Sequence, residues 1–548
     1  MSAGGPVAGR PGPERALHRG NIVALGIFVA LVGAVYFSLF NHDFSVNGLR
    51  YAEDVERGVE LFHPNHLLPN FLYRGAYLLA QHVGLAGIRA IWIMQAINVC
   101  AGLVAAAAIV RVGLLHGRSR PSIGAKVPAL VPDSRRSVAL LIGALYAFGF
   151  AAWNFAEEPD VYILPAAAVA VSMAIIAPRD RLGWRAIIVL GVLAAFAVLT
   201  LQQYVFWYPA LLLLVRARDL GAARRAKLLA LALGIPLACL GAYLLVGVAD
   251  GQLRSANDVL AWFLGYAWNS QAGFGTYRPA PDVGSRLLGT VLGLGNLAFA
   301  YEVILSRAAM IAAVVALLPL LLIAARTTGF LRSADPGPRR DATILALWCL
   351  ANVAFATWWE SRNIEFLFPS WVGALMLAAL ASAALDRRVL IAAVLLVAGV
   401  NLAVAFFPQH DWPARYRVVE ALARHEQLVK ADVLVTEELN TVAYLRYFDG
   451  VEVRFQPGAV SAAMHASEPL ARVRTALDSA LASGARVYTT ELDEHGRLRE
   501  IAHWFAPLGR SGYDGAVERD IEVLYGGLDT SEQPVPGARR VRNAPAPR

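Results

Sequence analysis

The stretch NGLRYAEDVERGVELFHPNHLLPNFLYR, residues 47–74, follows a long uncharged run at residues 22–40. It gathers acidic side chains and two histidines in one segment, although apolar runs dominate the next three hundred residues. An apolar run of this length can cross a hydrocarbon core of about 30 Å as a helix. The quoted stretch is therefore expected to be the first loop of a membrane protein, and its dense charge requires an explanation.

The composition supports a membrane protein. Hydrophobic residues make up 57% of the 548 residues and charged residues 16%, with a mean hydropathy of +0.50. Soluble proteins carry about 25% charged residues. The net charge is +8, but Lys and Arg fall in short loops between apolar runs, which is typical of cytoplasmic loops rather than of a nucleic-acid surface. The three cysteines lie inside apolar runs, so neither a disulfide framework nor a cysteine zinc site is predicted.

The apolar runs predict a polytopic α-helical membrane protein with eleven spans. We expect them at residues 22–40, 90–110, 137–153, 161–177, 186–201, 204–215, 228–248, 308–325, 342–358, 364–383 and 389–407. With the N-terminus in the cytoplasm, most loop Lys and Arg residues fall on the cytoplasmic side, as the positive-inside rule requires. The same distribution of Lys and Arg over the loops predicts a tight outer turn at Gln202-Gln203 and a helix along the outer membrane surface at residues 286–305.

The chain divides into four predicted regions. Residues 1–21 are predicted to be a disordered cytoplasmic tail, and residues 22–407 the transmembrane domain. Residues 409–527 alternate helical periodicity with short β-branched runs such as DVLVT, which predicts a small extracytoplasmic α/β domain. Residues 528–548 are rich in Pro, Arg and Ala and are predicted to be a disordered tail.

Acidic side chains are concentrated in the outer loops. They occur in the first loop and again in NFAEEPD, the next outer loop. A positioned carboxylate can take the proton of a hydroxyl group, and carboxylates from two loops beside an arginine could also hold a phosphate-containing substrate. The alternative is that each acid is merely solvated at the membrane surface. The candidate catalytic residues are Asp43, Glu53, Asp54, Glu158 and Asp160.

Arg362 and the two histidines of the first loop are further candidates. Arg362 follows two tryptophans at a span end, where it either binds phosphate or anchors the helix at the interface. His63 and His66 either contact substrate or lipid, serve a structural role, or bind a metal. In the last case a divalent cation would be held by Asp54, Asp160 and His66.

Three short motifs resemble the GT-C glycosyltransferases, in particular the protein O-mannosyltransferase and lipid A aminoarabinose transferase group. They are RYAEDVERG (50–58), EEPDVYILPA (157–166) and SRNIEFLFPSW (361–371), and the resemblance covers residues 20–407. It implies a sugar donor carried on polyprenyl phosphate and an acid of the first outer loop that acts as base. The expected substrate-binding residues are Asn47, Arg50, Tyr51, His63, His66, Tyr162, Gln203 and Arg362.

The chain departs from this pattern at Asn47, where the family has an acid. An amide cannot act as a base at neutral pH. Either Asp43, Glu53 or Asp54 has taken the role, or the reaction differs, or catalysis is lost.

The sequence thus predicts a membrane glycosyltransferase that moves a hexosyl or pentosyl group to an extracytoplasmic glycan, lipid or protein. The expected location is a bacterial inner membrane, with no nucleic-acid partner and no required cofactor beyond the cation left open above. One alternative is a transporter or flippase, which the scarcity of ionisable residues within spans disfavours. The other is a catalytically inactive GT-C-like assembly protein.

Overall fold

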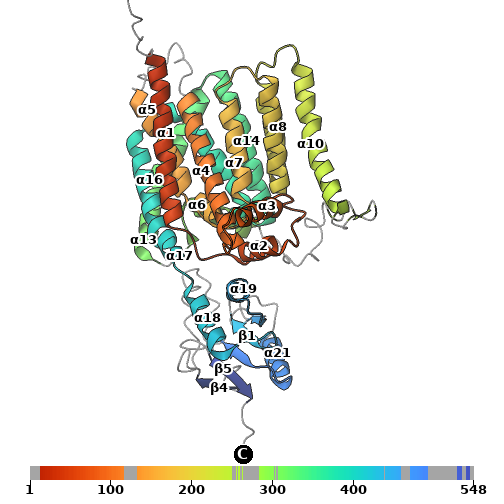
Figure 1. The fold of residues 1–548 in the computed structure, drawn as a ribbon. Coiled ribbons are helices and arrows are strands. Elements are labelled where there is room, and N and C mark those ends of the chain that lie inside the picture. Colours follow the sequence, from red (N-terminus) through yellow and green to blue (C-terminus); the bar gives the residue numbers. More distant parts are fainter. Residues whose placement is uncertain are drawn as a thin grey trace, which may run out of the picture.

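The computed structural model describes most of the chain and is built mainly of helices. The described residues are 13–116, 132–249, 283–457 without 302, 304, 305, 437 and 438, then 470–490, 528–532 and 539–543, with 253, 255, 257, 258 and 262 besides. Long helices stand side by side, and the short helices α2 (Val46–Arg57) and α3 (Pro69–His82) lie across their lower ends (Figure 1). The C-terminal domain lies below α2 and α3.

Helices occur at all eleven predicted span positions. Six helices of the described chain are long and apolar enough to cross a membrane, or seven if a bent pair counts as one span. The count of eleven stays a prediction, because α7, α8, α9 and α15 are shorter. The helices are α1 (Pro13–Ser38), α4 (Ala90–His116), α5 (Pro132–Phe148), α6 (Phe150–Glu157), α7 (Ile163–Ile176), α8 (Trp184–Thr200), α9 (Trp207–Arg216), α10 (Arg224–Ala249), α13 (Arg307–Ser333), α14 (Pro336–Trp359), α15 (Ile364–Leu380) and α16 (Arg387–Asn401).

The predicted span 137–153 is broken rather than straight. Helices α5 and α6 meet at Gly149 with a bend of 61°. Gly149 has extended backbone angles, and a Cβ atom there would lie only 2.8 Å from the ring of Trp371. Glycine permits both the break and this close approach. The bend matters because α6 leads directly into the acidic loop that begins at Glu158.

The segment predicted as an outer surface helix forms α12 (Val283–Ala298). It packs against the turn between α14 and α15, since a Cβ atom at Gly293 would lie 3.1 Å from the carbonyl oxygens of Ser361 and Arg362. Its depth in the membrane stays a prediction. Residues Gln202–Phe206, where a tight turn was predicted, form the 3₁₀ helix η1. Helix α16 continues through the π-helix η5 (Leu402–Phe406) into α17 (Phe407–His410).

The C-terminal domain contains one five-stranded sheet in the order β2-β1-β3-β5-β4. Strands β1, β2 and β3 are parallel, whereas β5 pairs with β3 and β4 in antiparallel fashion. Helix–strand alternation is thus observed where it was predicted. The elements are α18 (Ala414–Glu426), β1 (Val433–Thr436), α19 (Leu439–Tyr444), the π-helix η6 (Leu445–Asp449), β2 (Arg454–Pro457), α21 (Leu470–Ala482), β3 (Val487–Thr489), β4 (Leu528–Glu532) and β5 (Arg539–Asn543).

Both segments predicted to be disordered tails contain regular structure, so those two predictions were wrong in part. Helix α1 begins at Pro13, within the segment 1–21, and strands β4 and β5 lie within 528–548. Strand β5 pairs through its backbone with both β3 and β4. Composition alone does not reveal such pairing, because main-chain hydrogen bonds are available to every residue except proline.

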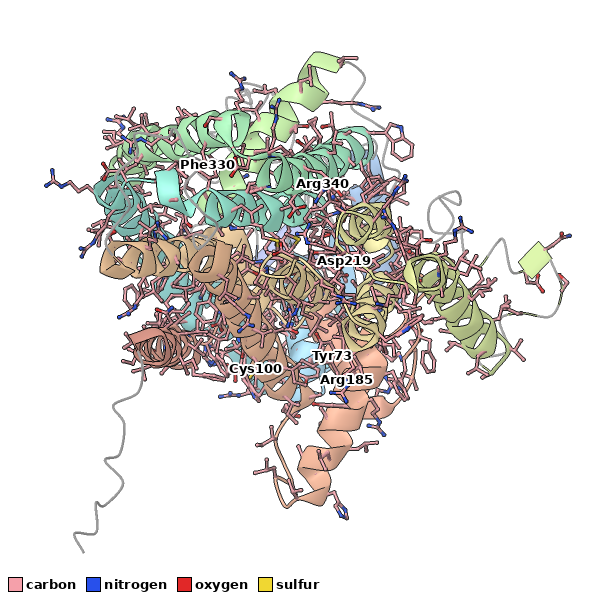
Figure 2. The ribbon with its side chains drawn as sticks, turned by 90° about the horizontal axis from the view of Figure 1, so that it is seen from above. Tyr73, Cys100, Arg185, Asp219, Phe330 and Arg340 are labelled. Carbon is pink, nitrogen blue, oxygen red and sulfur yellow. The ribbon has the colours of Figure 1, made fainter. Side chains whose placement is uncertain are left out.

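The end of the bundle opposite α2 is held by a buried ion pair. Arg218 donates to both carboxylate oxygens of Asp341, at 2.9 and 2.5 Å. The two residues are 8% and 2% exposed, so this pair is almost entirely removed from water. Figure 2 looks onto this end, where Asp219 and Arg340 lie among side chains that fill the space between the helices.

Candidate active site

Helix α2 carries the motif of the first loop and is fixed at both ends. The Ser45 hydroxyl accepts a hydrogen bond from the Gly48 amide, 3.0 Å away, and caps the N-terminus. At the other end Arg74 donates to the carbonyls of Val55 and Glu56, each at 2.8 Å. These bonds satisfy main-chain groups that a helix end leaves without partners.

The acidic loop after α6 is fixed by two polar side chains of the helices behind it. The Asn98 amide donates to the carbonyls of Glu158 and Asp160, at 2.7 and 2.8 Å. The Tyr73 hydroxyl lies 2.9 Å from the Asp160 carbonyl and 2.6 Å from Asn98 Oδ1. Residues 158–160 therefore have a defined backbone position above the apolar core.

Glu158 links this loop to the start of α2. Its Oε1 atom accepts from the amide and the hydroxyl of Ser45, at 2.9 and 2.7 Å. Burial raises the pKa of Glu158 to about 7; the two Ser45 hydrogen bonds oppose the rise, and the negative charges of Asp43 and Glu365 add to it. A carboxyl group in this state exchanges a proton near neutral pH.

Asp160 and Glu365 bring a second outer loop to the same place. Burial raises the pKa of Asp160 well above its usual range, and the nearby charges of Glu365 and Glu158 raise it further. Glu365 Oε2 accepts from the Tyr162 hydroxyl at 2.6 Å and from the Asn363 amide at 3.1 Å. Carboxyl groups of the loop after α6 and of the start of α15 thus lie close enough to raise the pKa of Asp160.

Arg362 lies on the turn before α15, three residues before Glu365. Its side chain is exposed and interacts electrostatically with Tyr301, which also interacts electrostatically with Glu365. No hydrogen bond or ion pair joins the Arg362 guanidinium to any residue of the described ranges. Of the two roles predicted for Arg362, phosphate binding and anchoring at the interface, both stay predictions.

Tyr51 and the two histidines form a neutral group beside the acids. The Tyr51 hydroxyl lies 3.0 Å from His66 Nε2, and the rings of His63 and His66 stack with their centres 4.4 Å apart. Burial lowers the pKa of His66 well below its usual range and that of His63 to about 4. Both imidazoles are uncharged at neutral pH and can donate or accept hydrogen bonds.

Two other acids of α2 are paired with arginines. Glu53 accepts from Arg57 at 2.9 Å and from Arg446 of the C-terminal domain at 2.8 Å. Asp54 lies 3.9 Å from Arg50, which is also paired with Glu60. Burial raises the pKa of Asp54 to about 6; the charge of Glu60 adds to the rise, and Arg50 opposes it. The Glu53 carboxylate is thus occupied by two arginines.

Asp43 and Asn47 lie at the entrance of α2. Asn47 is half-buried, and its side chain makes no hydrogen bond to the described residues. Tyr51 and Asp54 follow it on the same helix face, with Asp54 about 10 Å further along the axis at 1.5 Å per residue. Asp43 precedes the Ser45 cap, is exposed, and lies within electrostatic range of Glu158. Asp43 is therefore the acid of this loop that lies on the Asn47 side of α2.

Gln203, predicted to bind substrate, cross-links helices through its amide nitrogen, and its substrate role stays a prediction. Its amide donates to the Phe366 carbonyl at 2.7 Å and to Asn352 Oδ1 at 3.1 Å, and the residue is buried. The metal hypothesis also lacks its ligand set. Over the part of the chain that the structure describes, no three His, Cys, Asp or Glu side chains could hold a metal ion, so Asp54, Asp160 and His66 are not grouped in that way.

Sequence analysis missed the polar residues that support the site. Gln95 and Asn98 lie one turn apart within the predicted span 90–110, and Gln95 donates to the Asn41 carbonyl at 3.1 Å. Two amides at this spacing in an otherwise apolar run are a signal, because polar groups inside a span need partners. Tyr73 carried no such signal.

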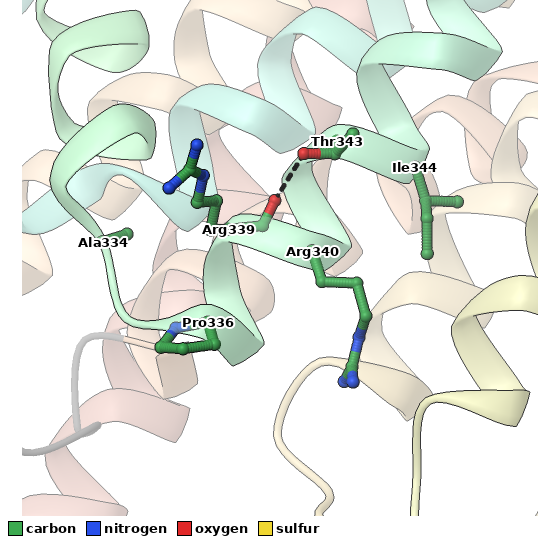
Figure 3. A pocket seen from close by; sticks show the side chains of 6 residues that line it. All are labelled: Ala334, Pro336, Arg339, Arg340, Thr343 and Ile344. Atoms are coloured by element: carbon green, nitrogen blue, oxygen red, sulfur yellow. Dashed lines mark hydrogen bonds between the residues drawn. The ribbon is translucent and has the colours of Figure 1, made fainter.

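A separate pocket of about 400 Å³ lies at the opposite end of the bundle (Figure 3). It is lined by the start of α14, and the Thr343 hydroxyl donates to the Arg339 carbonyl at 2.8 Å. The side chains of Arg339 and Arg340 extend in different directions. This pocket contains no acid and is remote from the carboxyl cluster.

The chain shares the fold of ArnT, a protein of the group that its loop motifs resemble. It is similar to ArnT from Cupriavidus metallidurans in the apo state, with 13% identity and a TM-score of 0.52 over 96% of this chain and 98% of that one. The structure of the same protein bound to undecaprenyl phosphate matches with 13% identity and a TM-score of 0.54, over 94% and 97% of the two chains. No family model matches the sequence, and no curated protein matches it. At this identity the likeness establishes the fold, and with it an integral membrane protein.

Proposed function

We propose that this protein is a glycosyltransferase that takes a sugar from a polyprenyl-phosphate donor and transfers it to a hydroxyl group on the outer side of the membrane. The observation that carries the proposal is the convergence of Asp43, Glu158, Asp160 and Glu365, from three segments of the chain. The exposed Arg362 precedes Glu365 by three residues, and both interact electrostatically with Tyr301. The similarity to a fold that binds undecaprenyl phosphate supports a lipid-linked donor.

The reaction assigns one role to each kind of group. Asp43 takes the proton from the acceptor hydroxyl while the oxygen of that hydroxyl forms a bond to the anomeric carbon of the donor sugar. The bond between that carbon and the phosphate oxygen breaks, and the polyprenyl phosphate leaves with the electron pair. Arg362 binds the leaving phosphate, since a guanidinium group matches two phosphate oxygens at once. The transfer balances in atoms and electrons without a further co-reactant.

Asp43 is preferred to Asp54 as base for a positional reason. The resemblance places the acid at Asn47, and Asp43 lies next to Glu158, which bonds to the cap of α2. Asp54 is almost two helical turns further on. Its pKa of about 6 would suit a base, however, so the Asp54 variant has to be tested in parallel.

The experiment uses the full-length protein in lipid nanodiscs with a panel of synthetic polyprenyl-phosphate sugars, and measures the release of polyprenyl phosphate. Asp43→Asn should reduce the rate by about 10²–10⁴, the usual contribution of a positioned base. Asp54→Asn should retain most of the rate. Arg362→Ala should weaken the binding of undecaprenyl phosphate measured by native mass spectrometry, and Arg362→Lys should weaken it less.

Three outcomes would contradict the assignment. If Asp54→Asn is inactive and Asp43→Asn is active, the base is Asp54. If undecaprenyl phosphate binds Arg362→Ala as tightly as the wild type, the phosphate role is wrong. If no donor of the panel is consumed and the protein moves a solute across proteoliposomes, it is a transporter.

A further inference from the structure

The C-terminal domain contacts the first loop through two tyrosines of one short helical segment. Tyr444 ends α19 and Tyr447 lies in η6, three residues later, so both project from neighbouring positions of the same surface. Tyr447 donates to Glu56 at 2.7 Å and accepts from the Ile91 amide at 3.2 Å. These contacts attach the domain to the end of α2 and the start of α4.

Tyr444 contacts a different part of the loop, on both sides of Asp43. Its hydroxyl donates to the carbonyl of His42 and accepts from the amide of Phe44. The hydroxyl thus bridges the two residues that flank the proposed base. The amide group of Asn440, one helical turn earlier, is 3.4 Å from the Phe44 carbonyl.

The rings of this contact are held in an aromatic cluster. The Phe44 side chain is fully buried and lies against Trp92, Tyr444 and Phe448, with ring centres 5.6 to 6.4 Å apart. Tyr444 also packs on Tyr416, at 4.9 Å. Loss of the Tyr444 hydroxyl alone would leave this apolar contact in place.

Asn41 restrains Asp43 from the membrane side. Its Oδ1 atom accepts from the Asp43 amide at 2.6 Å, and its Nδ2 atom donates to the Asp43 carbonyl at 3.1 Å. Gln95 in turn donates to the Asn41 carbonyl. Asn41, which follows the first predicted span, thus holds the backbone of Asp43 itself, and Tyr444 holds the two residues on either side of it. Its side chain stays exposed.

We infer that Tyr444 is a positioning residue of the active site, through which the C-terminal domain holds the carboxylate of Asp43 in place for proton transfer. This inference rests on the proposed function, because it takes Asp43 as the base. Its physical basis is that a displacement of about 1 Å at a reacting group can reduce a rate about 10²-fold. The domain is then part of the catalytic assembly rather than an appended module.

The test compares Tyr444→Phe with the matched control Tyr416→Phe in the full-length protein. The Tyr416 hydroxyl donates to Asp449 at 3.0 Å, so the control removes a hydroxyl from the same cluster without touching the first loop. Tyr444→Phe should reduce kcat about 10- to 100-fold and leave the donor KM and the affinity for undecaprenyl phosphate unchanged. Tyr416→Phe should change none of these.

Hydrogen exchange provides a readout that does not depend on activity. The Phe44 amide donates to the Tyr444 hydroxyl, so the peptide that contains residues 42–44 should exchange faster in Tyr444→Phe and at the wild-type rate in Tyr416→Phe. An unchanged exchange rate in Tyr444→Phe would overturn the inference even if the variant were inactive.

The double variant Asp43→Asn/Tyr444→Phe separates positioning from general stability. If Tyr444 acts through Asp43, the double variant should be no slower than Asp43→Asn alone, because its effect is already lost. Losses that multiply would show a merely structural role and overturn the inference. If Asp43→Asn alone retains full activity, the proposed base is wrong. If Asp43→Asn is inactive but Tyr444→Phe has the wild-type rate, the base is right and the role of Tyr444 is wrong.

Discussion

Glu158→Gln should make the protein more stable at alkaline pH and leave its stability at acidic pH unchanged. In the folded protein the pKa of Glu158 is raised by burial to about 7, compared with an ordinary value of 4.5. The folded state therefore binds the proton more tightly than the unfolded state. Below about pH 4.5 both states are protonated and the group favours folding fully; this contribution is lost as the pH rises through about 7.

The size of the effect follows from the difference between the two pKa values. A difference of about 2.5 units at 1.36 kcal/mol per unit corresponds to about 3 kcal/mol. Glu158 is only 6% exposed, so solvent screening does not reduce this figure much. The glutamine variant has no charge to desolvate, and its carbonyl oxygen can still accept the two hydrogen bonds of Ser45.

The assay is equilibrium unfolding in detergent at pH 5, 6, 7 and 8, with the free energy of unfolding of wild type and variant compared at each pH. The difference should grow by up to about 3 kcal/mol across this range. Glu60→Gln is the matched control, because Glu60 belongs to the same loop but its side chain is 64% exposed. A difference between wild type and Glu158→Gln that stays constant with pH would refute the assignment of a raised pKa.

Two further predictions concern stability and topology. Arg218→Ala or Asp341→Ala alone should lower the free energy of unfolding by about 3–5 kcal/mol, and the double variant should lower it by less than the sum of the two. Replacing the exposed pair Arg181–Asp219 should cost less than about 1 kcal/mol. Equal effects at the two pairs would contradict this prediction. Alkaline phosphatase fused to the C-terminus of the full chain should be active, because we expect the C-terminal domain to lie outside; activity confined to a cytoplasmic reporter would contradict the odd number of spans.

The positions of the helices could be predicted from sequence because each apolar run must satisfy its own backbone in the membrane. This argument needs only the residues of each apolar run, and it predicted the positions of the short helices as well. It did not predict the break at Gly149, or the close approach of the Trp371 ring to that glycine, which is a tertiary contact. An isolated glycine in an apolar run does not reveal which ring will occupy the space beside it.

The acids of the site could be named from sequence, but their individual states could not. Glu53 and Glu158 are the same residue type in two acidic loops. Glu53 is paired with Arg57 and Arg446, whereas Glu158 is buried next to Ser45. Arg446 lies almost four hundred residues away, and nothing in the first loop indicates that it is the partner. A similar separation in sequence explains why the contact of Tyr444 with His42 and Phe44 could not be foreseen.

The density of acids in the first loop raises an electrostatic problem for a protein that binds a phosphate-linked donor, because a row of ionised carboxylates would repel it. The structure resolves this problem in two ways. Glu53, Asp54 and Glu56 are paired with arginines, and Glu158 retains a proton near neutral pH because burial raises its pKa to about 7. The exposed Asp43 is then surrounded by acids whose charges are largely neutralised, and the exposed Arg362 can bind the phosphate. A site with one exposed carboxyl group and one exposed cation suits transfer from a phosphate leaving group, whereas a fully ionised loop would not.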